Sequence, residues 1–469
     1  MNRSQLVVLL VCVSLISLAG CGGGASSTTP APIGQNGSAQ LSVVVRDAPP
    51  SGVTVLSFEV TVTGATLQPG NVSLVNNPVQ IEVKRLEVEA ALLSTINVPA
   101  GTYSSISVTL ANPELTIKND SGSAIGGCAS GSVCELKPSV SGTVTYSGAP
   151  FPITIAANTP SGLLVDVNLN DIIQSNLGVN FQAPNAVVVN QLPSTQGNGE
   201  MEELEDLNGI VANKDASNNQ FTLHTTDGDF TTKVDNATAF EDFDEAGCAA
   251  NDFTCVQNGQ AVQVDLRLIA GGALLAKKIE LEDSSADDEL EGVVFSVDSA
   301  TQFKMVVIEE LRDVPGIDVG NPVTVTLGSN PSFRVDTDNL TVPTTLLNAF
   351  QGAVDTSPLM VGQNVQVRRL NGSSGTNITT DRVRLRMSRF TATVASVVPP
   401  NFSLSGLPSL FTGATPAVNQ IQVQTSAQTE FEGVTGVSSL AAGNTVSLRG
   451  LLFKSSPDPV MVAKKIRKR

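Results

Sequence analysis

The sequence has few of the side chains on which most catalytic and sugar-binding sites depend. Its 469 residues include no tryptophan, two tyrosines (Tyr103 and Tyr146) and one histidine, His224. A single histidine excludes a His-Glu-x-x-His zinc site and any site with several histidine ligands. The scarcity of tryptophan and tyrosine removes the aromatic platforms that sugar sites usually use. We therefore expect a protein that is not an enzyme and that needs no cofactor.

Short catalytic motifs are also missing. The sequence contains no Gly-x-Ser-x-Gly elbow and no phosphate-binding glycine loop placed after a strand. Asp120-Ser121-Gly122 matches the core triplet of aspartic proteases, but Lys118-Asn119 precede it, so a turn is expected there. His224 alternates with Phe221 and Leu223 and is expected to point to solvent. A pair of carboxylates that acts as in glycosidases stays open as an alternative.

The N-terminus has the pattern of a secretory signal. Residues 1–20 carry one positive charge, Arg3, before an apolar run from Leu6 to Val13, which is too short to span a membrane. Leu18-Ala19-Gly20-Cys21 resembles the bacterial lipobox. The resemblance implies cleavage before Cys21, lipidation of Cys21 and, with glycine next, sorting to the outer membrane. The alternative is an ordinary signal peptide. Residues 21–38 then comprise the lipidated cysteine and a flexible tether.

The other cysteines agree with export. Beyond Cys12 of the signal and Cys21, four remain, in two local pairs. They are Cys128 with Cys134 and Cys248 with Cys255. Each pair lies within one expected domain, so two structural disulfides are predicted, as is common in exported proteins.

Hydrophobic patterning indicates an all-β chain. Apolar residues alternate with polar ones, or gather in short runs rich in Val, Ile and Thr, as in Leu56–Val62 and Leu163–Leu169. Turn-forming residues separate the runs. Two segments have helical spacing, Val83 to Ile96 and Leu340 to Phe350, and short helices are expected there.

A diffuse threefold repeat follows a change in composition at residues 193–200. Its copies open 83 and 100 residues apart, which exceeds the period of a solenoid and indicates tandem domains. About six strands in each copy suit a small closed barrel. The copies open at Leu207–Val211, Leu290–Val294 and Phe390–Val394, share a Gly-x-x-Val strand from Gly259, Gly362 and Gly443, and in two cases end with Ala-Lys-Lys-Ile at 276–279 and 463–466.

Three short motifs precede the repeat: Asp47-Ala48-Pro49, the turn Pro99–Tyr103 and the strand Val165-Asp166-Val167. With them, residues 39–192 resemble an uncharacterised family of bacterial lipoprotein domains, and the repeats resemble a second uncharacterised family of small β domains. The resemblance implies an immunoglobulin- or transthyretin-like β-sandwich followed by three tandem small β-barrels. The expected segments are a signal peptide at 1–20, the tether at 21–38, the sandwich at 39–192, a linker at 193–204 and barrels at 205–283, 289–387 and 389–469.

Acidic residues outnumber basic ones by 44 to 27, and the net charge of −17 argues against binding to nucleic acid. Residues 200–300 hold 23 acidic and 5 basic side chains, a net charge of −18. Such oxygen-rich loops can bind Ca²⁺. Because the spacing Asp-x-Asp-x-Asp-Gly is absent, a solvated acidic face is favoured, and the question of a metal stays open.

Three arginines form the most prominent basic group. Arg382, Arg384 and Arg386 alternate with Val383 and Leu385, which places their side chains on one face of a strand. Three interpretations remain open. The face binds an external anionic ligand such as a phosphate or carboxylate polymer, it docks on the acidic first barrel, or it keeps an edge strand charged.

Together these features predict a membrane-anchored cell-envelope lipoprotein that acts as a non-catalytic scaffold, adhesin or binding module. We expect it at a bacterial outer membrane, on the periplasmic side or at the cell surface. Its expected partners are the membrane, through the lipid anchor, and an envelope protein or polyanionic polymer. The alternatives are an envelope polysaccharide- or peptide-processing enzyme with a carboxylate pair, and a Ca²⁺-dependent binding module.

Overall fold

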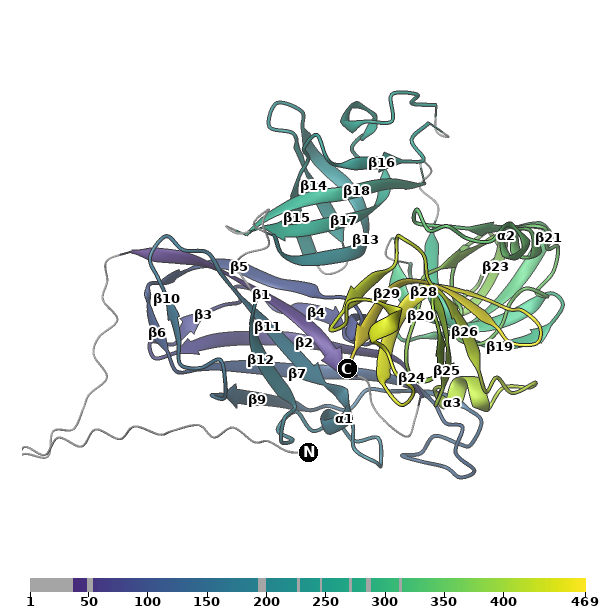
Figure 1. Cartoon of the computed structure of the whole chain (residues 1–469), viewed down its shortest axis with the longest axis horizontal. Coiled ribbons are helices and arrows are strands. Elements are labelled where there is room, and N and C mark those ends of the chain that lie inside the picture. Colours follow the sequence, from purple (N-terminus) through teal and green to yellow (C-terminus); the bar gives the residue numbers. More distant parts are fainter. Residues whose placement is uncertain are drawn as a thin grey trace, which may run out of the picture.

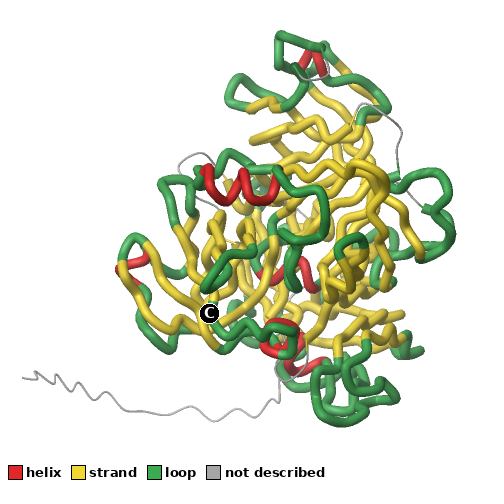
Figure 2. The backbone as a smooth tube through the Cα atoms, turned by 90° about the vertical axis from the view of Figure 1, so that its right-hand side faces the viewer, coloured by secondary structure: helices red, strands yellow, loops and turns green. Residues whose placement is uncertain are grey.

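A computed structural model describes residues 37–48, 54–192, 200–225, 228–244, 247–269, 272–283, 288–311 and 314–469. In this part of the chain strands dominate and the few helices are short (Figure 2), so the predicted all-β class is confirmed. The expected signal peptide, Cys21 and most of the tether lie outside the described residues. Among the helices of the described residues, none has the length and apolar character needed to cross a bilayer.

The N-terminal unit, here called the sandwich, contains two main sheets (Figure 1). The first sheet has the order β12-β11-β1-β5, with β1 parallel to β11 and antiparallel to β5. The second has the order β3-β2-β7-β8, with β4 beside β2 and β9 beside β7. The strands are β1 (Ser38–Ala48), β2 (Thr54–Gln68), β3 (Val72–Ser73), β4 (Val79–Glu82), β5 (Ala91–Pro99), β6 (Gly101–Tyr103), β7 (Ser105–Lys118), β8 (Val133–Leu136), β9 (Ser141–Tyr146), β10 (Ile153–Ile155), β11 (Ser161–Asn168) and β12 (Val187–Leu192).

One apolar core joins the two sheets of the sandwich. It contains Leu41 and Leu163 from the first sheet and Phe58 and Ile106 from the second, all nearly inaccessible to solvent. Tyr103 is fully buried in this core, and its hydroxyl donates to the carbonyl of Pro99 at 2.7 Å. The Pro-Ala-Gly-Thr-Tyr segment is therefore a turn closed by its own tyrosine. The unit also contains β6 paired with β10, the 3₁₀ helix η1 (Lys84–Glu87) and the short helix α1 (Leu169–Ile172).

Three small barrels follow the sandwich (Figure 1). Barrel 1 consists of β13 (Glu200–Asp215), β14 (Gln220–Thr225), β15 (Gly228–Lys233), β16 (Ala239–Glu241), η2 (Phe253–Cys255), β17 (Ala261–Ile269) and β18 (Ala273–Asp283). Barrel 2 consists of β19 (Glu289–Ser299), β20 (Gln302–Glu310), β21 (Pro322–Val335), α2 (Thr344–Gln351), β22 (Asn364–Arg368) and β23 (Asn377–Arg386). Barrel 3 consists of β24 (Ser388–Val398), β25 (Asn401–Ser405), α3 (Ser409–Thr412), β26 (Ile421–Gln424), β27 (Glu430–Glu432), η3 (Val437–Ser439), β28 (Thr445–Phe453) and β29 (Val460–Lys468).

The three barrels share one strand order. In barrel 2 the closed order is β19-β20-β21-β23-β22, and the pairing of β21 with β23 is parallel. In barrels 1 and 3 the parallel pairs β15–β18 and β26–β29 close the equivalent ring. Three consecutive antiparallel strands, closed by a parallel pairing of the third with the fifth, give the topology of the OB-fold, a five-stranded Greek-key barrel.

The glycine of the repeat motif has a defined backbone role in every barrel. Each of these glycines has a positive φ, of 91°, 82° and 87° in chain order, a conformation that other residues adopt at a cost. Each donates its N–H at 2.8 Å to the carbonyl of the valine in the opening motif, which joins the first and fourth strands. The donor–acceptor pairs are Gly259 with Val211, Gly362 with Val294, and Gly443 with Val394.

One of the two expected helices is wrong. Residues 83–96 contain only the one-turn η1, after which β5 begins at Ala91. The helical spacing is overridden because β5 pairs antiparallel with β1, and this pairing satisfies the backbone groups on one edge of β1. The second helix is present as α2. Strand β13 begins at Glu200 and includes the end of the expected linker, while residues 193–199 lie outside the described part of the chain.

Candidate functional site

The sandwich and the three barrels meet at a group of buried charged side chains, here called the junction cluster. All four units contribute to it, and most of its members are less than 10 % exposed. Charged groups this deep are normally paired, because an unpaired buried charge is costly. The cluster consists of Glu89, Glu205, Asp206, Asp265, Lys278, Glu280, Glu282, Glu291, Asp336, Asp338, Arg384, Arg386, Arg389, Arg449 and Lys465.

Arg449 of barrel 3 is the centre of the junction cluster and is fully buried. Its Nε lies 3.0 Å from Glu89 of the sandwich and donates to Asp206 of barrel 1 at the same distance. Its terminal nitrogens lie 3.3 Å from Glu205 of barrel 1 and 3.8 Å from Asp338 of barrel 2. One guanidinium therefore contacts carboxylates of the three other units.

Further ion pairs join the units around Arg449. Lys278 of barrel 1 contacts Asp338 of barrel 2 at 2.5 Å and its own neighbour Glu280 at 2.9 Å. Arg389 of barrel 3 lies 2.6 Å from Glu89 and 2.7 Å from Asp206. Because the pairs with Asp338, Glu89 and Asp206 cross unit boundaries, relative movement of the units would separate buried opposite charges.

The charges of the cluster shift the pKa values of its carboxyl groups in both directions. Burial by itself would raise the pKa of Asp206, but the guanidiniums of Arg449 and Arg389 hold it below its usual range. Burial raises the pKa of Glu280 well above its usual range, and nearby Asp336 adds to the effect. Burial also raises the pKa of Asp265, to about 7, although Lys278 opposes the change. The cluster therefore contains a carboxyl group, that of Asp265, whose pKa lies near neutral pH.

The repeat places one cation at the same register position of each barrel. The fifth strand faces the Gly-x-x-Val strand through the pairs Val264↔Ile279, Val367↔Val383 and Leu448↔Ile466. The residues one position earlier are Lys278, Arg382 and Lys465. Lys278 pairs with Asp338, Arg382 with Glu289, and Lys465 with Glu205. The sequence showed this position only as the repeated Ala-Lys-Lys-Ile, without indicating that its second lysine is buried.

The arginines of β23 face carboxylates of the chain itself. Arg386 contacts Glu282 of barrel 1 at 2.7 Å and Asp336 of barrel 2 at 2.6 Å, and Arg384 also pairs with Glu282. Arg384 and Arg386 are less than 10 % exposed. Strand β23 lies between β21 and β22, so it is not an edge strand. Of the three interpretations, the structure contains the contact with the acidic first barrel, because the guanidiniums of Arg384 and Arg386 face Glu282.

Two groups of carboxylates lie close enough together to resemble a cation site, and both contain a positive side chain of the protein. Around Glu203, Glu205 and Glu430, Lys277 lies 2.5 Å from Glu203 and 3.4 Å from Glu430. Around Glu280, Glu282 and Asp336, the cations are Lys278 and Arg386. Lysine and arginine thus take the place that a metal ion would have.

We accordingly expect Ca²⁺ to leave stability unchanged. The midpoint of thermal unfolding should be the same in a chelator and in millimolar Ca²⁺, because no acidic group here offers an uncompensated set of oxygens among the described residues. If Ca²⁺ bound one site and its concentration were a hundred times the dissociation constant, the free energy of unfolding would rise by about 2.7 kcal/mol. A rise in the midpoint of several degrees with Ca²⁺ would contradict this expectation and revive the Ca²⁺-dependent module.

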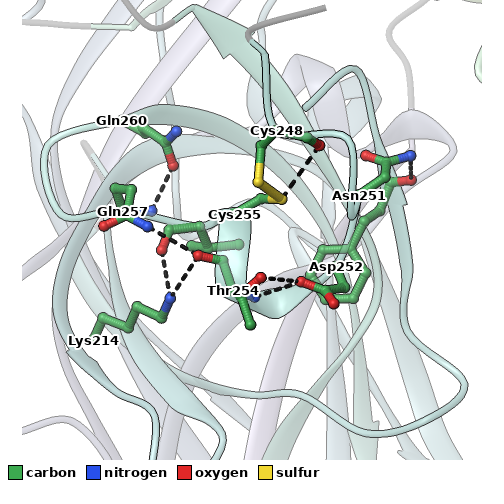
Figure 3. Close-up of a disulfide and its surroundings, with 10 residues drawn as sticks. Lys214, Cys248, Asn251, Asp252, Thr254, Cys255, Gln257 and Gln260 are labelled. Carbon is green, nitrogen blue, oxygen red and sulfur yellow. Dashed lines mark hydrogen bonds between the residues drawn. A yellow bond between two sulfur atoms is a disulfide. The ribbon is translucent and has the colours of Figure 1, made fainter. Parts of the chain in front are cut away.

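Both expected cysteine pairs form disulfides in the structure, Cys128–Cys134 and Cys248–Cys255. Figure 3 shows the second, in the connection between β16 and β17. Lys214 reaches this loop from β13 and donates to the carbonyl of Val256 at 2.7 Å, and its ammonium lies 4.8 Å from the ring centre of Phe253. The loop is held by the disulfide, by Lys214 and by its own turns, which assigns these cysteines a structural role.

The other candidate residues of the sequence make local contacts or lie outside the described part of the chain. The side chain of His224 is 67 % exposed and pairs with Asp229 across the β14–β15 hairpin. Asp120 lies in the loop that follows β7, where Lys118 contacts it at 3.0 Å. Cys21, the predicted lipidation site, lies outside the described residues.

A cavity of about 650 Å³ lies beside the junction cluster, and no pattern in the sequence indicates it. Strand β2 and η1 of the sandwich, β24 and α3 of barrel 3, and residues of barrel 2 form its wall. Two carboxylates, Glu82 and Glu87, are part of that wall. Its residues come from segments more than 300 positions apart, so only the packing of the units brings them together.

Comparisons with known proteins agree with this division of the chain. Residues 38–183 match a family described as Domain of unknown function (DUF4382), which covers most of the sandwich. Residues 208–280 and 409–467 match Domain of unknown function (DUF5666), in barrels 1 and 3. Barrel 2 falls outside both matches but shares the strand order of its neighbours. No curated protein matches the chain.

Two solved structures are weakly similar. One is drosophila Unr CSD456, with 10 % identity and a TM-score of 0.12 over 56 % of this chain and 97 % of that one. The other is a multidomain protein with nucleic acid binding domains from streptococcus pneumoniae tigr4, with 9 % identity and a TM-score of 0.11 over 57 % and 73 %. Both scores are too low to support any conclusion about this chain. The chain is therefore built from domains similar to two uncharacterised families, the first forming a sandwich and the second forming small barrels.

Proposed function

We propose that this protein is a non-catalytic binding scaffold of a bacterial cell envelope, anchored in the outer membrane through lipidated Cys21. The contact of Arg449 with carboxylates of the three other units carries the scaffold part of the proposal. A scaffold must hold its surfaces at fixed distances from one another. Ion pairs that are buried between units serve this purpose. If the units moved apart, each buried charge would lose its partner, which is energetically costly.

The state of the carboxylates in the cavity supports a non-catalytic role. Glu82 accepts hydrogen bonds from the backbone N–H groups of Phe58 at 2.9 Å and Arg85 at 2.6 Å, one at each oxygen. Glu87 pairs with Lys84 through one oxygen and accepts from the hydroxyl of Thr391 at 3.5 Å through the other. All four oxygens thus have partners within the chain. A general acid or base needs an oxygen directed at substrate, so the alternative of a carboxylate-pair enzyme is less well supported.

The outer face of barrel 3 supports the expectation that nucleic acid is not a partner. OB-fold barrels that bind single strands use the second and third strands and stack bases on aromatic side chains there. In barrel 3 these strands, β25 and β26, direct their aromatic and aliphatic residues to the core. The residues that alternate with them are polar: Asn401, Ser405, Gln422, Gln424 and Ser403, the last of which is buried.

The anchor is tested by metabolic labelling in a diderm bacterium. The wild-type chain should incorporate labelled palmitate and sediment with the membranes, whereas Cys21→Ser should incorporate none. Cys12→Ser is the matched control, because it removes the other cysteine of the N-terminal segment and should leave labelling intact. Wild-type protein without label, recovered in the soluble fraction, would refute the anchor and the location inferred from it.

A further inference from the structure

The cavity beside the junction cluster has the size of a small-molecule site. Its volume of about 650 Å³ lies within the range of about 300–1,000 Å³ of typical ligand pockets. It opens where the sandwich meets barrel 3, a position between units that is common for such sites. Ion pairs of the junction cluster join the units that form the wall, so the cavity does not depend on a ligand for its shape.

Apolar side chains form one part of the wall. Phe390 of β24 and Phe411 of α3 pack edge to face with ring centres 5.1 Å apart, and both are almost fully buried. Leu56 of β2, Leu407 and Leu410 extend this surface on either side. A ligand that fills this region must present an apolar surface to these side chains.

Positive side chains dominate the polar part of the wall. Four cationic residues line the cavity against two anionic ones, Glu82 and Glu87, in a chain whose net charge is −17. Burial raises the pKa of Glu82, although the backbone N–H groups of Phe58 and Arg85 oppose the change. The four cations are Lys84, Arg85, Arg389 and Arg469.

The cations are held in place by the chain. Lys84 pairs with Glu87, and Arg85 lies 3.3 Å from Glu309. Arg469 donates to the carbonyl of Glu87 at 2.6 Å and to the hydroxyl of Ser447 at 2.8 Å. Because the geometry of these groups is set before a ligand arrives, little entropy is lost when they contact an anion.

One buried acceptor in the cavity wall has no partner. Asn364 is 2 % exposed, and its amide nitrogen donates to Glu291 and to the carbonyl of Met387. Its Oδ1 has no hydrogen-bond partner among the residues that the structure describes. Leaving such a group unsatisfied costs about 1–3 kcal/mol, which a donor from outside the chain would recover.

We propose that the cavity binds one small amphipathic anion with a hydrogen-bond donor. The apolar body lies against Phe390 and Phe411, the anionic group lies near Lys84, and the donor meets Oδ1 of Asn364. This inference deepens the proposed function and rests on its non-catalytic binding role. It names the class of ligand that the scaffold would bind.

A pair of dyes tests the site. Anilinonaphthalene sulfonate has an aromatic body, an N–H donor and a sulfonate, while phenylnaphthylamine has the same body and donor without the charge. The protein is the oxidised mature chain, residues 21–469, with Cys21→Ser, so that neither lipid nor detergent competes for the dyes. We expect one molecule of the sulfonate per chain, bound about tenfold more tightly than the neutral dye.

Two variants place the dye in the cavity. Lys84→Gln should weaken the sulfonate about fivefold and the neutral dye by less than twofold. Thr412→Trp, at an exposed residue of the cavity wall, should block both dyes. Lys454→Gln is the matched control, since it removes an exposed lysine that is not part of the wall, and should change neither affinity.

Each outcome decides the proposal. Equal affinity for the two dyes would overturn the anionic part, and unchanged binding in Thr412→Trp would show that the dyes bind elsewhere. Thr412→Trp keeps the test valid if Lys84→Gln does not fold. The assay uses protein without lipid, so failure of the site leaves the anchor intact, and failure of palmitate labelling leaves the site intact.

Discussion

Replacing Arg449 by methionine should lower the free energy of unfolding by about 3–5 kcal/mol. Methionine fills much of the same volume but leaves Glu89, Glu205 and Asp206 without the guanidinium that they surround. These carboxylates are less than 10 % exposed, so water cannot replace the lost partner at low cost. Urea unfolding followed by circular dichroism measures the loss.

The same substitution should also loosen the arrangement of the units. Without Arg449 the buried carboxylates lose part of their compensating positive charge, so they repel one another more strongly across the boundaries that Arg449 joins. We expect the radius of gyration from small-angle scattering to rise, while the β content of the separate units is retained. A variant with wild-type stability and dimensions would show that Arg449 does not couple the units, and the scaffold proposal would fail with it.

Two controls accompany Arg449→Met. Arg334→Met removes an exposed arginine from β21 and should change stability by less than about 0.5 kcal/mol. Arg449→Lys keeps the positive charge but replaces the planar guanidinium by a compact ammonium group. The ammonium cannot contact all the carboxylates that surround Arg449 at once. Its stability should lie between those of the wild type and the methionine variant.

Local pattern was sufficient to predict the all-β class and several of the strands. The alternation of apolar residues identified β2 and β11, and the repeat motifs mark the first and fourth strands of every barrel. Those motifs could be read because each records a local requirement. Gly259 and its equivalents adopt a positive φ. The N–H of each glycine donates to the carbonyl of the valine in the opening motif of the same barrel.

The helix expected over residues 83–96 shows where local pattern fails. Leu86, Ala90 and Leu93 have helical spacing, yet η1 ends at Glu87 and Leu93 belongs to β5. Ala91 and Leu93 of β5 are buried and Leu92 between them is less so, as at the start of a strand with one face on a core, so the same apolar residues satisfy either period. The choice depends on β1, which lies about 50 positions earlier in the chain.

The junction cluster could not be predicted for a related reason. A count of charges treats residues 200–300 as a solvated acidic face, but Glu205, Asp206 and Glu282 are buried. Their burial follows from the contact of barrel 1 with its neighbours, which no local spacing records. A bulge between Leu204 and Leu207, with φ of 54° at Asp206, further breaks the alternation that would assign these side chains to a face. The cavity depends on the same packing.

Replacing Asp265 by asparagine should stabilise the protein above neutral pH and have little effect near pH 4. Asp265 is buried on β17, and its Oδ1 accepts a hydrogen bond from the backbone N–H of Asp206 at 2.9 Å, which an asparagine oxygen can also do. The charged groups around it are Lys278, Asp338, Asp206 and Arg449. Burial raises its pKa from 3.8 to about 7, against the attraction of Lys278.

The direction of the pH effect follows from proton binding. Between about pH 4 and pH 7 the folded protein keeps a proton on Asp265 that the unfolded chain has lost, so the stability of the wild type falls as pH rises through this range. Asparagine has no proton to lose and removes this contribution. The difference between the two pKa values corresponds to at most about 4 kcal/mol above pH 7.

Urea unfolding of both proteins from pH 4 to pH 8.5 measures this difference. The curves should coincide near pH 4 and separate as pH rises, with the Asp265→Asn variant more stable. Asp244→Asn, which removes one carboxyl from an exposed loop, should follow the wild type throughout. Curves that run parallel from pH 4 to pH 8.5 would mean that Asp265 is ionised in the folded protein at every pH, with Lys278 and Arg449 fully compensating its burial. The junction cluster would then be an ordinary set of ion pairs, without a carboxyl group that titrates near neutral pH.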